Sequence, residues 1–85
     1  MRENVMEGIG TFFVVLAFGI SGEPLSIGLM YAAMIYIGAH ISGAHYNPGI
    51  TFAFFILKKI KLKKALSYML SQIVGAFLAS IVLLY

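Results

Sequence analysis

The chain has 85 residues, of which 61% are hydrophobic and 11% are charged; soluble domains carry about 25% charged residues, so this composition excludes an ordinary water-soluble domain and predicts a membrane protein. The net charge of +3 does not indicate nucleic-acid binding, because five of the six cations lie in one connection between apolar segments, at Lys58, Lys59, Lys61, Lys63 and Lys64. The absence of cysteine excludes both a disulfide framework and a thiolate metal site.

The first apolar segment, about residues 5–20, predicts a short spanning helix that ends in a turn at residues 21–24. Glu7 and Thr11 lie four residues apart and therefore share one face of this helix. A carboxylate is costly in lipid, so we expect this face to point into protein or a wet cavity. The alternative is that Glu7 sits at the level of the lipid headgroups. Small neighbours would let another backbone approach closely, namely Gly8, Gly10 and Thr11.

The second segment, about residues 25–41, follows a short turn and is therefore predicted to run antiparallel to the first. It carries small residues suited to tight helix packing, namely Ser26, Gly28, Ala32, Ala33, Gly38 and Ala39. His40 near its end is expected to be a hydrogen-bonded structural group; a proton relay or metal ligand is the alternative. No carboxylate or cysteine lies beside it in a ligand spacing, which disfavours a metal site.

Residues 42–51 interrupt the apolar chain with polar and backbone-exposing residues. Asn47 before Pro48 is typical of a helix start, because Asn caps with its side-chain oxygen and Pro at the first position loses only an unpaired amide hydrogen. The helix that begins at Pro48 reaches Lys58 after about ten residues, or roughly 15 Å. That is about half of a ~30 Å hydrocarbon core. We therefore predict a re-entrant loop and half-helix over about residues 42–57.

The last segment, about residues 65–84, is long enough to span a membrane. Small residues recur every four positions and predict a packing stripe at Ser71, Gly75 and Ala79. Gln72 is the strongly polar side chain in the middle of this helix, so we expect it to face a partner rather than lipid. Its role is either functional or a plain hydrogen bond between helices.

Charge predicts the topology of the chain. With three full spans and one re-entrant piece, Arg2 and the five lysines fall on the same side of the membrane, while the opposite short loop carries Glu23 and no cation. Cytoplasmic loops carry the excess of Lys and Arg. We therefore expect a multi-pass protein of the cell membrane with a cytoplasmic N-terminus and an external C-terminus.

The re-entrant stretch is predicted to be either a plug or a pore wall, because non-helical backbone at membrane depth must be buried or line a water-filled cavity. In a pore, the carbonyls of residues 43–46 would offer a ladder of acceptors. The half-helix N-terminus carries about +0.5 charge and disfavours cations. Asn47 would keep its amide hydrogens free to donate. Such a pathway suits a neutral solute that has both hydrogen-bond donors and acceptors, such as water.

Three motifs resemble the N-terminal half of an aquaporin, a member of the major intrinsic protein family. The signature loop is matched by Ala39-His40-Ile41-Ser42-Gly43-Ala44-His45-Tyr46-Asn47-Pro48-Gly49-Ile50-Thr51. The first-helix motif is matched by Glu7 with Gly10-Thr11-Phe12, and the third helix by Tyr68, Gln72 and Gly75-Ala76. The resemblance covers nearly the whole chain. It implies an all-α membrane protein of three transmembrane helices plus one re-entrant half-helix, forming one repeat over residues 1–85. Selection would rest on pore diameter, lining hydrogen bonds and half-helix dipoles.

The resemblance also implies roles for single residues. Asn47 and Pro48 would form the first of two pore-centre motifs, and Glu7 would hold the loop in place. The residues expected to line the pore are Gly43, Ala44, His45, Tyr46, Asn47, Pro48, Gly49 and Ile27. Those expected to support the loop are Glu7, Gln72 and His40. No catalytic residue, metal or cofactor is implied.

The chain departs from the family pattern in three ways. Gly49 replaces the usual Ala and loosens the first helical turn by up to about 1 kcal/mol. Ile27 falls where many water-specific members carry an aromatic residue, which favours small neutral solutes other than water alone. The second repeat, with its half-helix and arginine, is missing, since Arg2 is the one arginine of the sequence.

One half cannot enclose a pore by itself, so the second half must come from elsewhere. Two antiparallel copies would supply it, as inverted repeats do within one chain. Six cations on one side and none on the other should instead fix one orientation. We therefore expect a separate inverted partner chain, or a truncated remnant that does not conduct, in preference to a homodimer.

The leading hypothesis is half of an aquaporin-type channel for water or a small neutral solute such as glycerol. The alternative is a non-conducting membrane fragment or structural subunit. A proton-coupled carrier using Glu7, His40 and His45 is disfavoured because nothing arranges these groups as a relay. An enzyme is disfavoured because no nucleophile–base pair or metal constellation is present.

Overall fold

The protein is built entirely from helices. The computed structural model describes residues 1–85 and contains, in chain order, α1 (Arg2–Ile20), α2 (Pro24–Ser42), α3 (Pro48–Ile56) and α4 (Leu62–Leu84). Helices α1, α2 and α4 are long and apolar enough to cross a membrane. Helix α3 has nine residues, or about 14 Å, which is about half of the hydrocarbon core. The predicted class, three membrane-spanning helices plus one short helix, is confirmed.

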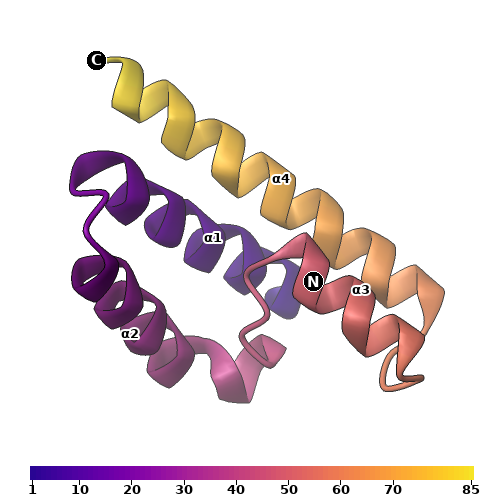
Figure 1. Ribbon diagram of the computed structural model, residues 1–85. Helices are drawn as coiled ribbons and strands as arrows, with labels where there is room; N and C mark the ends of the chain where they lie inside the picture. The colour runs from indigo at the N-terminus through magenta and orange to yellow at the C-terminus, as the bar shows by residue number, and fades with distance from the viewer.

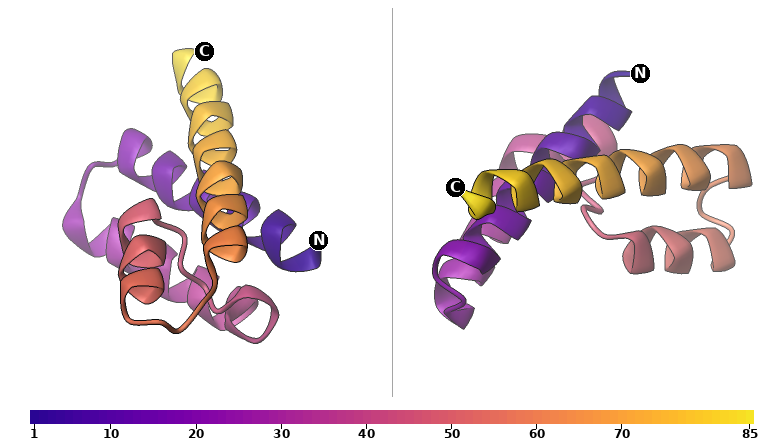
Figure 2. Two further views of the ribbon diagram at one scale, coloured as in Figure 1. Left: turned by 90° about the vertical axis from the view of Figure 1, so that its right-hand side faces the viewer. Right: turned by 90° about the horizontal axis from the view of Figure 1, so that it is seen from above.

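Helix α1 lies at the centre of the arrangement and packs against both α2 and α4, while α3 packs against α4. Figure 1 shows α3 alongside the first part of α4, with residues 43–47 running between the end of α2 and the start of α3. The two views in Figure 2 show that α1 and α2 form an antiparallel pair that crosses α4 at an angle. The loop of residues 43–47 lies between the helices near the middle of the molecule, and α3 then leads away from it toward the start of α4.

The spanning helices begin slightly before their apolar runs. Helix α1 starts at Arg2 and α4 at Leu62, each three residues earlier than the hydropathy predicts. The reason is that hydropathy marks the part that lipid can cover, whereas backbone hydrogen bonds continue through the polar ends. Pro24, expected in the turn, is instead the first residue of α2, because the Glu23 side chain caps the amides of Leu25 and Ser26 at 3.1 and 2.9 Å.

The buried core is small. Only 16 of the 85 residues are buried, and the central apolar cluster consists of Met6, Met34, Ala44 and Tyr46. Most large apolar side chains are exposed on all three long helices. Because water would solvate this surface poorly, the fold needs lipid or other protein around it.

Glycines allow close packing at two places in the fold. A Cβ on Gly75 of α4 would collide with the carbonyl oxygen of Gly8 on α1, so the two backbones touch there, as the small residues of α1 predict. Gly10 and Gly38 instead leave room for the side chain of Tyr46. Gly28 has no atom within 4 Å of its would-be Cβ, and most of the small residues expected to pack along α2 are exposed, namely Ser26, Gly28, Ala33 and Ala39.

Candidate functional site

The loop of residues 43–47 is held in a strained backbone conformation. Gly43 ends α2 with φ 88°, and Ala44 and Tyr46 both have φ 55°. The left-handed region costs roughly 1–2 kcal/mol for a residue with a Cβ. Ala44, His45 and Tyr46 are nevertheless buried. Contacts from the surrounding helices must therefore fix this conformation.

Glu7 on α1 is the main support of the loop. Its side chain is fully buried and accepts four hydrogen bonds. The first oxygen binds the amide of Tyr46 at 2.7 Å and Nε2 of Gln72 at 2.8 Å. The second binds Oγ of Ser42 at 2.6 Å and the amide of His45 at 3.1 Å. This confirms that Glu7 points into protein.

The direction of the Ser42 hydrogen bond follows from its neighbours. The Ser42 oxygen already accepts the amide of Ala44 at 3.2 Å, so its hydroxyl hydrogen is available for Glu7. Four donors then face the two oxygens of Glu7, and this surrounding matches an ionised carboxylate, which only accepts. Charge-assisted hydrogen bonds of this kind are about twice as strong as neutral ones.

A second chain of hydrogen bonds joins α4, α3 and the loop. Gln72 Nε2 donates to Oγ1 of Thr51 at 2.9 Å, and Thr51 Oγ1 lies 2.9 Å from Nδ1 of His45. Thr51 Oγ1 therefore bridges Gln72 and His45, and the direction of its bond with Nδ1 depends on the tautomer of the ring. The ring also stacks on Phe54 at a centroid distance of 4.5 Å. His45 is thus held at Nδ1 and on one face of its ring.

Three tyrosine hydroxyls bind main-chain carbonyls around the loop. Tyr68 donates to the carbonyl of Ser42 at 2.6 Å and Tyr46 to that of Met34 at 2.7 Å. Tyr31 donates to the carbonyl of His45. One of the loop carbonyls expected to face a solute is therefore already hydrogen-bonded, and its second lone pair remains.

Asn47 caps α3 as its position before Pro48 predicts. Its Oδ1 accepts the amides of Gly49 at 2.6 Å and Ile50 at 3.4 Å. The amide hydrogens of Asn47 make no hydrogen bond within the chain and remain free to donate. The residue is exposed, so these donors are accessible.

A groove of about 560 Å³ runs beside Asn47 between α1, α2 and α4. Four residues expected to line a pore border it, namely Ile27, Tyr46, Asn47 and Pro48. Two buried atoms without a hydrogen-bond partner, Oγ1 of Thr11 and Oε1 of Gln72, belong to residues of the same lining. The groove therefore combines an apolar wall with the free amide donors of Asn47, and two unpaired oxygens lie buried behind that wall.

The other predicted residues lie elsewhere. Ala44 and His45 are buried against the supporting helices, while Gly43 and Gly49 are exposed away from the groove lining. His40, expected to support the loop, is exposed on α2 and makes no side-chain hydrogen bond. Its side chain lies outside the network that holds the loop.

Sequence reasoning did not single out two residues of the network. Thr51 is the one polar residue of α3 and lies one turn after Asn47, which was an available signal. Tyr31 sits in an apolar stretch of α2 that also contains Tyr36, and nothing in the pattern distinguishes its hydroxyl.

The chain is similar in sequence to a family of known proteins. The family model described as major intrinsic protein matches residues 1–85. The chain is 36% identical over 89 residues to glycerol uptake facilitator protein-like 6 of Lactiplantibacillus plantarum, covering 94% of this chain and 41% of that protein. It is 32% identical over 98 residues to aquaporin Z of Photorhabdus laumondii, covering 98% of this chain and 42% of that protein.

A eukaryotic relative matches a shorter stretch. Aquaporin-B of Dictyostelium discoideum is 47% identical over 60 residues, covering 71% of this chain and 20% of that protein. The chain thus spans less than half the length of these curated relatives. The family model nevertheless extends over every residue from 1 to 85, and so the chain belongs to the major intrinsic protein family.

Proposed function

We propose that this chain forms one half of an aquaporin-type channel for the passive passage of water or a small neutral solute. The observation that carries the proposal is Asn47, whose oxygen caps α3 and which borders a groove lined also by Ile27. The exposed amide of Asn47 offers donors to a polar solute, and the apolar wall of the groove accommodates its carbon atoms.

The helix α3 also predicts which charges the channel would exclude. The N-terminus of α3 adds a partial positive charge next to Asn47, which opposes cations. The wall of the groove at Ile27 is aliphatic and favours a small solute with a carbon backbone, such as glycerol, beside water. One relative with this overall similarity is a glycerol uptake facilitator-like protein and others are aquaporins.

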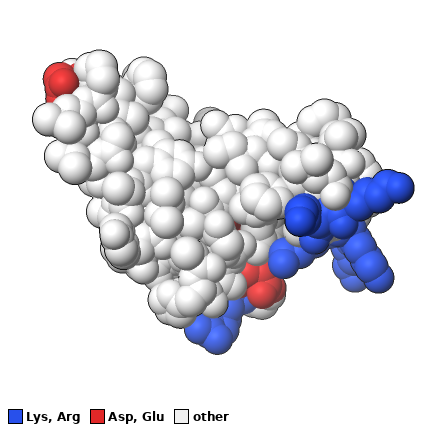
Figure 3. All heavy atoms as spheres, turned by 60° about the horizontal axis from the view of Figure 1, so that its bottom comes forward, with Lys and Arg blue, Asp and Glu red and all other residues white.

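Residues 1–85 would act as a single half-repeat, and an inverted second half would close the open side of the groove. Figure 3 shows Lys and Arg in two groups along the lower and right-hand side of the molecule, with one acidic group beside them, while the far end carries a single acidic group and no cation. This distribution favours a cytoplasmic N-terminus and an external C-terminus. It also favours a separate partner chain over two copies of this chain in opposite orientations.

Osmotic shrinkage of liposomes tests the proposal. The purified chain would be reconstituted alone and together with a chain carrying an inverted Asn-Pro half-helix, and water and glycerol fluxes would be followed by light scattering. We expect flux above that of empty liposomes only with the partner. Ile27→Phe should then lower glycerol flux more than water flux. No flux under either condition would support the alternative, a non-conducting membrane subunit.

Accessible tags at both ends test the orientation. In cells, the N-terminal tag should be protected and the C-terminal tag exposed to an impermeant reagent. Substantial populations in both orientations would contradict the single topology and favour a dimer of two antiparallel copies.

A further inference from the structure

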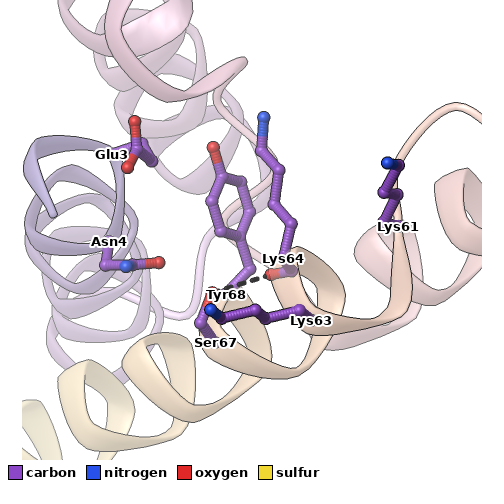
Figure 4. A pocket seen from close by; sticks show the side chains of 7 residues that line it. All are labelled: Glu3, Asn4, Lys61, Lys63, Lys64, Ser67 and Tyr68. Atoms are coloured by element: carbon purple, nitrogen blue, oxygen red, sulfur yellow. Dashed lines mark hydrogen bonds between the residues drawn. The ribbon is translucent and has the colours of Figure 1, made fainter.

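A second hollow lies where the start of α1 meets the start of α4, and it shares no lining residue with the groove beside Asn47. Its volume is about 420 Å³. Helix α1 contributes Glu3 and Asn4, and the start of α4 contributes Lys61, Lys63, Lys64, Ser67 and Tyr68. Figure 4 shows Asn4 of α1 pointing toward Tyr68 of α4, with Glu3 beside it on α1 and Lys61 standing apart on the segment that precedes α4. None of its three lysines borders the groove of the channel proposal.

The charge of this hollow is not balanced within the chain. No lysine of the chain lies within 4 Å of a carboxylate, and the one ion pair joins Glu3 to the amino group of Met1 at 2.6 Å. Three lysines against one carboxylate leave a net positive lining. A neighbouring hollow of about 540 Å³ shares Lys61 and Lys64 and adds Lys58 and Lys59. The field around the site is therefore strongly positive.

Free backbone amides at the start of α4 also favour an anion in this hollow. The first backbone hydrogen bond at the start of α4 runs from the amide of Ala65 to the carbonyl of Lys61, so the amides of residues 62–64 have no acceptor. Lys61 provides no side-chain cap. Free amides and the positive end of a 23-residue helix favour an anion.

One lysine is held at the site. The ammonium of Lys64 lies 5.4 Å from the centroid of the Tyr68 ring, which is fully buried. Ser67 Oγ donates its hydrogen to the carbonyl of Lys64 at 3.0 Å and so is not a donor to the hollow. Cation–π attraction limits the freedom of the Lys64 side chain, so less entropy is lost when it binds a ligand.

The position of the hollow indicates the source of the anion. It lies at the end of two membrane-spanning helices, α1 and α4, which is the level of lipid headgroups. Leu62 and Leu66 beside it on α4 are 53% and 56% exposed and offer an apolar surface to acyl chains. Basic pockets between transmembrane helices bind anionic headgroups.

We propose that this hollow binds the phosphate group of an anionic phospholipid, with Lys61, Lys63 and Lys64 and the free amides of α4 as its donors. The lipid tails lie along the exposed apolar face of α4. This binding requires neither conduction nor a partner chain, so it stands or falls separately from the channel.

Affinity for short-chain phosphatidylglycerol, measured on the full chain in a neutral detergent, tests the site. The triple variant Lys61→Gln, Lys63→Gln, Lys64→Gln removes the lining charges. The matched control Arg2→Gln, Lys58→Gln, Lys59→Gln removes the same charge outside the hollow. Each lysine near an anionic headgroup contributes roughly fivefold, so the first variant should bind about a hundredfold more weakly. The control should lose at most about tenfold.

An equal loss in the two triple variants would overturn the site, because it would mean diffuse attraction to the whole basic end. Helical circular dichroism checks that both variants fold. If the first triple variant loses helix, the single changes Lys63→Gln and Arg2→Gln repeat the comparison, and only the former should weaken binding.

Two further ligands distinguish the sources of the phosphate. Phosphatidylcholine, which is zwitterionic, should bind at least tenfold more weakly than phosphatidylglycerol. Inorganic phosphate in tenfold excess should not displace the lipid. Displacement by inorganic phosphate, with the same dependence on the three lysines, would assign the hollow to a soluble anion and overturn the lipid proposal.

Discussion

The carboxylate of Glu7 and the backbone amide of Tyr46 are joined by a hydrogen bond of 2.7 Å across 39 residues of sequence. Tyr46 has a left-handed backbone, which exposes its amide and that of His45 toward α1. The strain of the loop and the buried charge of α1 therefore compensate each other. Each would be unfavourable without the other.

Glu7→Gln should destabilise the fold by about 1–3 kcal/mol. The amide keeps the shape of the side chain but presents hydrogens where the carboxylate accepted four hydrogen bonds, so at least one buried donor loses its partner. Thermal unfolding in detergent, followed by circular dichroism, measures the difference.

The matched control is Thr11→Val, one turn further along the same face. The Thr11 hydroxyl is buried without a partner, so its removal should be neutral or should stabilise by up to about 1 kcal/mol. If Glu7→Gln loses no more stability than Thr11→Val, the fold would not depend on the four hydrogen bonds of Glu7.

Gly10→Ala should destabilise by about 1–3 kcal/mol, because its Cβ would overlap the ring of Tyr46 and push the loop away from α1. Gly28→Ala, where the added Cβ meets nothing within 4 Å, should stabilise α2 by up to about 1 kcal/mol. Chemical denaturation of both variants in the same detergent checks the pair. A Gly10 variant as stable as the parent would contradict the position of the Tyr46 ring.

Lys58→Gly should stabilise the protein by about 1 kcal/mol. Lys58 follows the end of α3 with φ 61°, a conformation that a residue with a Cβ adopts at a cost and glycine adopts freely. Lys59 has no positive φ, so Lys59→Gly should give no gain or a small loss. The two variants carry the same charge change, and their unfolding midpoints can be compared directly. Equal midpoints would mean that the turn is not strained at Lys58.

The cap of α2 should depend on pH. Hydrogen bonds from the amides of Ser26 and Leu25 lower the pKa of Glu23 below its usual value of 4.5. A lowered folded-state pKa contributes stability above the unfolded pKa, and this contribution is lost as the pH falls through the folded pKa. Glu23→Ala should therefore be less stable than the parent near pH 7, and the gap should narrow below about pH 4. Melting curves across this range test it; a gap independent of pH would contradict a charged cap.

The sequence allowed the helices of this fold to be predicted well. Composition required lipid, three apolar runs gave the three long helices, and Asn47 with Pro48 gave the start of α3. These features depend on backbone hydrogen bonding, capping and hydropathy within one segment, which are local properties. The ends of the helices were displaced by a few residues because hydropathy does not report backbone hydrogen bonds.

The candidate site could be predicted only in part. The pattern indicated that Glu7 and Gln72 face protein, and the structure brings them together at 2.8 Å. It did not indicate Thr51 as the link between Gln72 and His45, and it placed His40 among the supports although that side chain is exposed. Both residues are polar groups at helix ends or in a half-helix, and their partners depend on how α2 and α3 are rotated.

Local chemistry in the sequence determined that three helices are apolar enough to cross a membrane and that a short helix capped by Asn47 begins at Pro48. Tertiary structure alone decided which donors meet the carboxylate of Glu7 and that Gly10 and Gly38 make room for Tyr46. It also brought Glu3 and Asn4 to the lysines at the start of α4. These contacts join residues far apart in the chain, and they depend on the rotation and crossing of whole helices, which side-chain packing sets and no single segment encodes.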